Sequence, residues 1–132
     1  MLRLSTLTAI MLAAATAQTF AQDSDGESEY MVACAVCHGE SGKGAGPFAP
    51  LLNIEVPGLT TLAADNEGEF PFLKTFMMID GRSPIRAHGS EMPVWGDRYL
   101  KSAREYFGPY GAEIVTNGRI LSLVNYLETI QE

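Results

Sequence analysis

The pentapeptide Cys34-Ala35-Val36-Cys37-His38 decides how the rest of the chain is interpreted. Its two cysteines are the only ones in the chain, and their i, i+3 spacing puts both thiols on one face of a helical turn. There each thiol can add to a vinyl group of a porphyrin, while the adjacent His38 is placed to ligate the iron. The motif therefore predicts covalent attachment of one haem c at Cys34 and Cys37, with His38 as the proximal axial ligand.

The motif has three alternative interpretations. A thioredoxin-type pair normally follows a strand in a βαβ pattern and does not need the histidine. A zinc site requires two further ligands, and the only other histidine is His88. A structural disulfide is compatible with an oxidising compartment. A small, exported and otherwise cysteine-free chain favours haem over all three.

The first residues have the features of a secretory signal peptide. Arg3 supplies a short positive region, and residues 4–17 are almost uncharged and apolar but too few to span a bilayer comfortably. Small residues allow cleavage after residue 21 or after residue 17, and an uncleaved N-terminal anchor is the alternative. We expect residues 1–21 to be removed, which leaves a periplasmic domain of residues 22–132 without a membrane span.

Composition and charge limit the class of partner. The chain has 132 residues, of which 46% are hydrophobic, as suits one globular domain. Its formal charge of -7 excludes the basic surface that binding to nucleic acid requires. Loss of Arg3 makes the mature chain one unit more acidic, so redox partners are expected to dock through a basic face. We expect the free protein to be a monomer.

Chain breakers and apolar periodicity predict a mostly helical protein with extended loops. A short helix over residues 28–35 leads into the motif, whereas residues 39–57 contain too many glycines and prolines for regular structure. Apolar residues at i, i+4 and i+7, between a proline and a glycine, predict a helix over residues 71–80. A last helix is expected from Gly118 to the chain end, and no segment alternates as a strand would.

The sequence resembles the small bacterial class I cytochromes c over about residues 26–131. The resemblance rests on CAVCHG, on the glycine-rich GKGAGP after it, on EMPVWG and on the closing GRILSLVNYLETIQ. The spacing of IDGR, HG and MPVWGD further resembles a group of exported proteobacterial cytochromes. The resemblance implies an all-α fold in which the N- and C-terminal helices pack around one covalently bound haem, with Gly118, Leu121 or Tyr126 where they cross.

The same resemblance implies a partner for the proximal histidine. In this family a proline carbonyl accepts a hydrogen bond from that ring, which fixes its tautomer and raises its basicity as a ligand. Pro47 is the first candidate for this carbonyl, and Pro50 is the second.

Met92 is the expected sixth ligand of the iron. It lies 54 residues after His38 and directly before Pro93, in a stretch whose prolines and glycines indicate a loop. Pro93 restricts Met92 to extended geometry, which suits a loop that brings a thioether to the distal face. A methionine that merely fills a gap in the core is one alternative. His88 is the rival ligand, and two histidine ligands would lower the reduction potential.

Haem propionates require hydrogen-bonding partners because buried charge is costly. Trp95, the only tryptophan, can donate one N–H while its ring packs against the porphyrin edge. A core tryptophan without this contact is the alternative. Arg82 and Arg86 are further candidates.

These expectations together predict a one-electron carrier rather than an enzyme, because the sequence contains no paired acid and base, no activated nucleophile and no phosphate-binding loop. A haem c subunit of a larger dehydrogenase or oxidase would have the same sequence features. A haem protein with an open distal site for gas or small molecules is the other alternative.

Overall fold

All secondary structure that the computed structural model describes is helical. The structure describes residues 21–82 and 92–132. Its elements are α1 (Ala21–Ala33), α2 (Ala35–His38), the short 3₁₀ helices η1 (Ala49–Leu51) and η2 (Ala64–Asn66), α3 (Phe72–Asp80) and α4 (Trp95–Thr129). No strand occurs in these two ranges. The expected all-α fold is confirmed.

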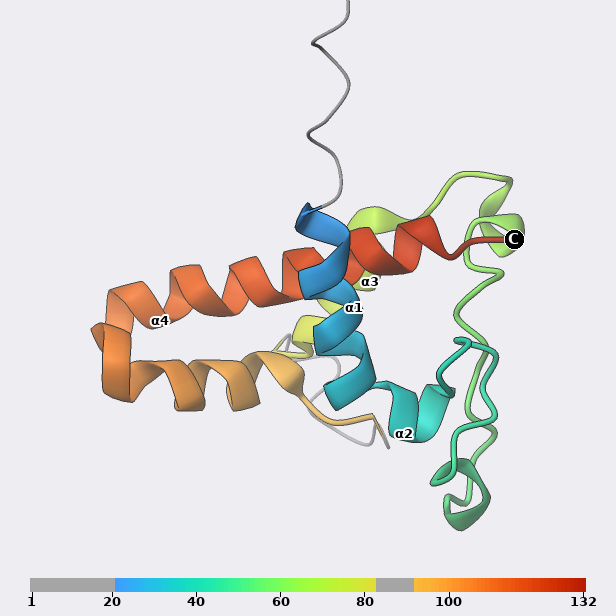
Figure 1. Cartoon of the computed structure of the whole chain (residues 1–132), viewed down its shortest axis with the longest axis horizontal. Helices are drawn as coiled ribbons and strands as arrows, with labels where there is room; N and C mark the ends of the chain where they lie inside the picture. The colour runs from blue at the N-terminus through green and yellow to red at the C-terminus, as the bar shows by residue number, and fades with distance from the viewer. Residues whose placement is uncertain (1–20, 83–91) are drawn as a thin grey trace, which may run out of the picture.

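The centre of the fold is the crossing of α1 over the C-terminal half of α4 (Figure 1). Tyr30 of α1 and Ile120, Leu123 and Val124 of α4 have no exposed surface, and they form one core cluster with Cys34. The rings of Tyr30 and Tyr126 lie with their centroids 5.3 Å apart. The core therefore carries the first cysteine of the motif on the same helix pair that holds the fold together.

Gly26 is the point of closest approach at this crossing. A Cβ atom at Gly26 would overlap the backbone carbonyl oxygen of Ser122 and lie 2.8 Å from the Cβ of Tyr126. Of the three expected crossing residues, Tyr126 is confirmed. Gly118 and Leu121 are wrong, because Gly118 has no neighbour within 4 Å of a built Cβ and Leu121 is 43% exposed.

The helix α1 begins at Ala21, seven residues before the expected start at residue 28. Its first turns are polar, so they give no apolar periodicity, yet acidic residues near a helix N-terminus interact favourably with the helix dipole. Between residues 25 and 32 of α1 the buried residues are Gly26 and Tyr30, one per turn. The sequence pattern therefore underestimates the length of this helix.

The long element α4 is a helical hairpin rather than one straight helix. Gly108 has φ 64° and ψ 178°, and Pro109 follows it, so the chain turns back there (Figure 1). We call residues 95–107 limb 1 and residues 109–129 limb 2. The expected start of the last helix at Gly118 is wrong, since Gly118 lies exposed in the middle of limb 2.

Limb 1 was not expected, because Pro93 and Gly96 indicated a loop. The structure shows why a glycine occurs inside a helix here. A Cβ at Gly96 would overlap the carboxylate of Asp80 and lie 2.6 Å from Nε of Arg82. Gly96 thus permits limb 1 to pack closely on the end of α3.

The helix α3 matches the expected range to within one residue. It begins at Phe72, directly after Pro71, and ends at Gly81, which has φ 66° and donates its N–H to the carbonyl of Met77 at 3.0 Å. Its buried Ile79 belongs to the core cluster, and α3 packs on α4. The positive φ explains the glycine at the helix end.

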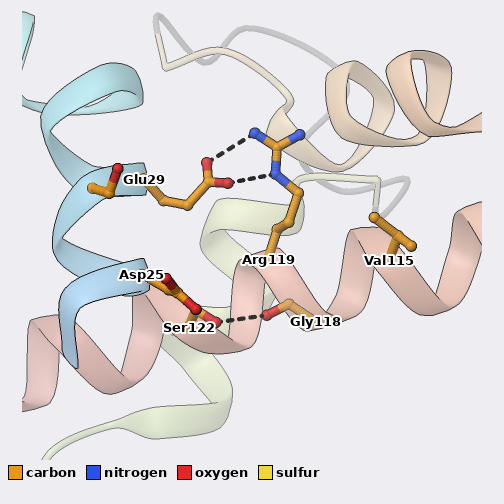
Figure 2. A pocket seen from close by; sticks show the side chains of 7 residues that line it. Asp25, Glu29, Val115, Gly118, Arg119 and Ser122 are labelled. Atoms are coloured by element: carbon orange, nitrogen blue, oxygen red, sulfur yellow. Dashed lines mark hydrogen bonds and ion pairs between the residues drawn. The ribbon is translucent and has the colours of Figure 1, made fainter. Parts of the chain in front are cut away.

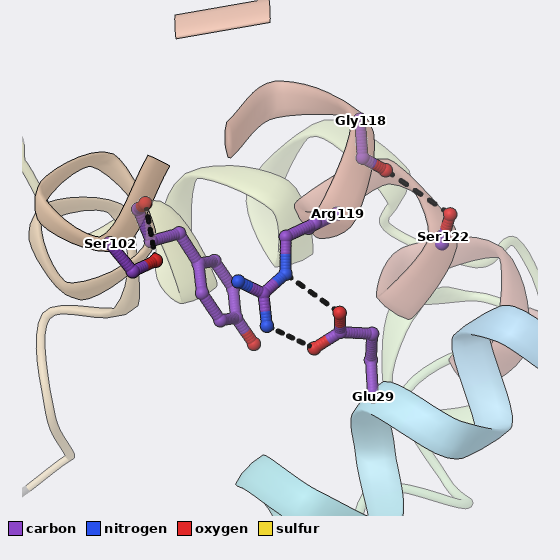
Figure 3. A network of polar contacts seen from close by, with 6 residues as sticks. Glu29, Ser102, Gly118, Arg119 and Ser122 are labelled. Atoms are coloured by element: carbon purple, nitrogen blue, oxygen red, sulfur yellow. Dashed lines mark hydrogen bonds and ion pairs between the residues drawn. The ribbon is translucent and has the colours of Figure 1, made fainter. Parts of the chain in front are cut away.

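One arginine links α1 with both limbs of the hairpin. Arg119 of limb 2 donates to both carboxylate oxygens of Glu29, at 2.7 and 2.9 Å, as Figure 3 shows. Its guanidinium also lies 3.9 Å from the ring centroid of Tyr99 in limb 1. Burial, with the Glu29 charge adding to it, raises the pKa of Tyr99, so this ring is a neutral phenol under the guanidinium.

A cavity beside this ion pair is open and polar. It has a volume of about 370 Å³ and lies between α1 and limb 2, lined by Asp25, Ser28, Glu29, Val115, Gly118, Arg119 and Ser122 (Figure 2). No residue expected to bind haem lines it.

Replacing each of two helical glycines by alanine should have opposite effects on stability. Gly26→Ala should lower the free energy of unfolding by about 2 kcal/mol, because the added methyl group forces the crossing apart. Gly118→Ala should raise it by about 0.5–1 kcal/mol, because alanine loses less backbone entropy in an open helix position. Urea unfolding of the haem-loaded protein, followed by helical circular dichroism, measures both changes.

Each variant is the control for the other, since both add one methyl group to a helix. Equal stabilisation by the two substitutions would show that α1 and α4 do not approach closely at Gly26.

Candidate functional site

The two motif cysteines are held on one helical turn between α1 and α2. The N–H of Cys37 donates to the carbonyl of Cys34 at 3.1 Å, and the N–H of His38 donates to the same oxygen at 2.9 Å. Both thiols are free, Cys34 buried and Cys37 half-buried. The helical turn expected from the spacing is confirmed.

The environment of Cys34 favours the neutral form of its thiol. Burial raises the pKa of the Cys34 thiol to about 12, and the charges of Glu29 and Cys37 add to this effect. Within residues 21–82 and 92–132, no group of three His, Cys, Asp or Glu side chains could hold a metal ion. A neutral thiol in an apolar environment suits Cys34, whose sulfur is expected to form a thioether bond to the apolar porphyrin.

His38 has a defined partner at one ring nitrogen. Its Nδ1 lies 3.0 Å from the carbonyl oxygen of Pro57. A carbonyl can only accept, so Nδ1 carries the proton and donates, and the lone pair of Nε2 is left for a metal. The residue type and its chemistry agree with the expected proximal ligand.

The expectation that Pro47 or Pro50 accepts this hydrogen bond is wrong; the acceptor is Pro57. Pro47, Pro50 and Pro57 are all exposed, and the residues on either side of Pro47 donate to the motif through the N–H groups of Gly46 and Phe48. Pro57 ends the same loop, where the chain returns towards His38. Pro57 is the last proline of the glycine-rich segment, and this position is the one feature of the sequence that could have pointed to it. Choosing among the three prolines also requires knowing where the loop returns to His38.

The glycine-rich loop packs directly on the motif backbone. Gly44 donates to the carbonyl of His38 at 2.8 Å, Gly46 to Cys37 at 3.0 Å and Phe48 to Val36 at 2.8 Å. A Cβ at Gly46 would lie 2.5 Å from the carbonyl oxygen of Val36 and 2.6 Å from that of Cys37. Backbone contact at this distance excludes any side chain at Gly46. The loop therefore fixes the end of α2, and with it the orientation of His38.

Met92 packs against the core cluster that contains Cys34. Three other methionines in the described ranges, Met31, Met77 and Met78, are instead between 37% and 51% exposed. This placement agrees with a thioether that faces the interior. Residues 83–91, and with them the candidates Arg86 and His88, lie outside the described residues.

Apolar side chains around the motif fit a flat, apolar prosthetic group. The core cluster is flanked by half-buried Phe70, Phe72, Phe76, Leu59, Met92 and Trp95. Val36, Phe48, Leu51 and Ile54, in α2 and the loop after it, are between 46% and 71% exposed. Together with the two thiols and the free Nε2 of His38, these residues have the donor set and the apolar surface that haem c requires.

Trp95 and Arg82 were expected to contact propionates. Trp95 is half-buried at the start of limb 1, its ring centroid is 5.6 Å from that of Tyr99, and the Arg98 guanidinium lies 5.2 Å above it. Arg82 donates from Nε to Asp80 at 2.7 Å and from Nη1 to Glu113 of limb 2 at 2.8 Å. These carboxylates engage the Arg82 guanidinium within the protein, which argues against a propionate role. No pattern in the sequence indicated this bridge between the end of α3 and the hairpin.

Comparison with known protein families agrees with the geometry. The family model for cytochrome c matches residues 23–131, which is most of the chain. Searches of curated proteins and of solved structures gave no match. None of the helices within the described ranges has the length and apolar character needed to cross a membrane. The match covers the motif turn, the His38 hydrogen bond and the helix crossing alike, and the chain therefore belongs to the cytochrome c family of small mono-haem proteins, which bind haem c covalently and transfer electrons through its iron.

Proposed function

We propose that this protein is a periplasmic single-electron carrier whose one haem c is bound through Cys34 and Cys37 and ligated by His38 and Met92. The hydrogen bond from His38 Nδ1 to the Pro57 carbonyl is the observation that carries the proposal. It orients the ring, selects the tautomer with Nε2 free, and makes that nitrogen a better ligand.

The chain contributes a low-polarity surrounding and a fixed proximal ligand. Haem c, when bound, supplies an iron that gains and loses one electron. The Gly44 and Gly46 hydrogen bonds hold the His38 side of the site, so little rearrangement accompanies a change of charge. Met92 supplies a soft thioether from the core, which favours the reduced state of iron. Two protein ligands leave no iron position for a substrate, as suits a carrier rather than an enzyme.

Export is the second part of the proposal. The family match begins at residue 23, just after the expected cleavage position at residue 21. Removal of residues 1–21 would release a domain of residues 22–132 into the periplasm, where haem attachment to a CxxCH motif takes place. The partners would be redox proteins with a basic docking face.

Covalent attachment predicts that haem stays with the denatured chain. In-gel haem staining after denaturing electrophoresis should give a strong band for the wild type. Cys34→Ser with Cys37→Ser should abolish that band, because no thioether can form. Val36→Ala, within the motif but without a thiol, is the control and should stain normally. Loss of colour from the wild type on denaturation alone would rule out covalent attachment.

Met92 ligation predicts a spectroscopic and a redox change. The oxidised wild type should show the weak far-red sulfur-to-iron absorption band, and Met92→Ala should lose it and admit carbon monoxide or imidazole. The reduction potential should fall by on the order of tenths of a volt, within the range of about 0.8 V that axial ligands span. Met77→Ala, which removes a methionine that is 51% exposed, is the control and should change neither. An unchanged spectrum in Met92→Ala would show that Met92 is not the sixth ligand and would point to His88 instead.

The acidic charge predicts salt-dependent electron transfer. With a formal charge of -7 before processing, the protein should react with a cationic small oxidant faster at low salt, and with an anionic one faster at high salt. Most of the change should fall below about 0.1 M salt, where the Debye length is about 10 Å. Stopped-flow oxidation across a salt series measures both slopes. If neither rate constant changes with salt concentration, the net charge does not influence the approach of the oxidants to the site of electron transfer.

A further inference from the structure

The turn of the α4 hairpin carries a group of exposed aromatic and aliphatic side chains. Tyr106 is 77% exposed, Phe107 57%, Tyr110 82% and Ile114 58%. We call these four residues the apolar tip. In Figure 1 the turn lies at the end of the hairpin that is far from α1 and α2. The apolar tip is thus a convex feature outside the core and away from the proposed haem site.

Two helical limbs that pack on each other below the turn carry the apolar tip. Ala103 of limb 1 and Ala112 and Thr116 of limb 2 are buried, and such small residues allow two helices to pack closely. Gly108 and Pro109 form the turn, and nothing lies within 4 Å of a Cβ built at Gly108. Exposed apolar groups of this size mark interaction sites on soluble proteins.

The unpaired positive charge of the described chain gathers beside the apolar tip. Three basic residues are engaged in ion pairs: Lys43 with Glu132, Arg82 with Asp80 and Glu113, and Arg119 with Glu29. The basic residues of the described ranges that make no ion pair there are Lys74 of α3 and Arg98, Lys101 and Arg104, all exposed on limb 1. Limb 1 also exposes the carboxylates of Asp97 and Glu105, so its three cations leave it a net charge of +1 in a chain whose formal charge is -7.

We propose that the apolar tip and the basic residues of limb 1 bind the surface of an anionic phospholipid bilayer. Tyrosine rings, with an apolar body and a polar end, suit the boundary between headgroups and acyl chains. Lys101 and Arg104 lie one to two turns behind the tip, where they meet anionic headgroups. The acidic remainder of the chain is repelled by the same surface, so only the hairpin end is presented to it.

Charge and shape favour a bilayer over a second copy of this chain. Symmetric pairing of two hairpins would bring two convex tips and two basic limbs together, and like charges oppose that contact. If the apolar tip of one copy docked on the acidic face of another, the contact would be head-to-tail. Such a contact does not give a closed dimer but continues from copy to copy. A fluid lipid surface needs no complementary pocket.

The test uses the haem-loaded full-length protein and vesicles made of equal parts phosphatidylglycerol and phosphatidylcholine. Wild-type protein should co-sediment with these vesicles at low salt and should stay in solution with vesicles of phosphatidylcholine alone. Lys101→Gln and Arg104→Gln should each lower the partition coefficient about fivefold. Phe107→Ser combined with Tyr110→Ser should lower it about tenfold at unchanged helicity, since apolar burial is lost.

Matched controls come from α3, which also exposes an apolar and a basic residue side by side. Leu73 is 69% exposed, and Lys74 is the basic residue outside the hairpin that makes no ion pair within residues 21–82 and 92–132. Leu73→Ser and Lys74→Gln should leave the partition coefficient unchanged.

Three outcomes would overturn the proposal. One is the absence of wild-type co-sedimentation with anionic vesicles. Another is an equal loss of binding in the α3 controls and the hairpin variants. The third is a concentration-dependent dimer, seen in sedimentation equilibrium and abolished by the Phe107 and Tyr110 substitutions, which would assign the apolar tip to self-association. None of these readouts depends on electron transfer or on the iron ligands.

Discussion

The close crossing of α1 and α4 is the contact on which the rest of the structure depends. At Gly26 the two backbones approach so closely that no side chain fits between them. One turn later Tyr30 is completely buried, and its hydroxyl donates to the carbonyl of Gly39 at 2.6 Å. Burial raises the pKa of Tyr30 to about 12, so the hydroxyl keeps the proton that it donates. Cys34 follows one turn further along, so the crossing sets the position of the motif.

The ligand side of the site is built mainly from backbone atoms. His38 is oriented by a carbonyl of Pro57, and the loop that carries this proline is fixed to α2 through the N–H groups of Gly44, Gly46 and Phe48. Leu59 closes the loop by donating to the carbonyl of Gly42 at 2.6 Å. These backbone hydrogen bonds can survive many changes of side chain, but they are lost if the course of the backbone changes. Glycine is therefore required at Gly46, where a Cβ atom would overlap the motif carbonyls of Val36 and Cys37.

Features set by local spacing could be predicted from the sequence, and features set by the path of the chain could not. The turn at Cys34 and Cys37 and the ends of α3 at Pro71 and Gly81 follow from residues a few positions apart. Pro57 could not be chosen over Pro47, because the choice depends on where a long loop returns. Limb 1 was missed for a related reason: Gly96 indicates a break locally but serves close packing on Asp80.

The contacts of Arg119 divide the hairpin into regions of unequal local stability. Near its base, limb 1 is held to α1 through the stack of Tyr99 on Arg119 and the ion pair of Arg119 with Glu29. Opening limb 1 there exposes the core, so the base belongs to the same cooperative unit as the helix crossing. Between Ala103 and Ala112 the large side chains are exposed, so the turn makes few contacts that would be lost when it opens. Amide protons around Gly108 would therefore exchange through local fraying, while those around Tyr99 and Ile120 exchange only when the whole domain unfolds.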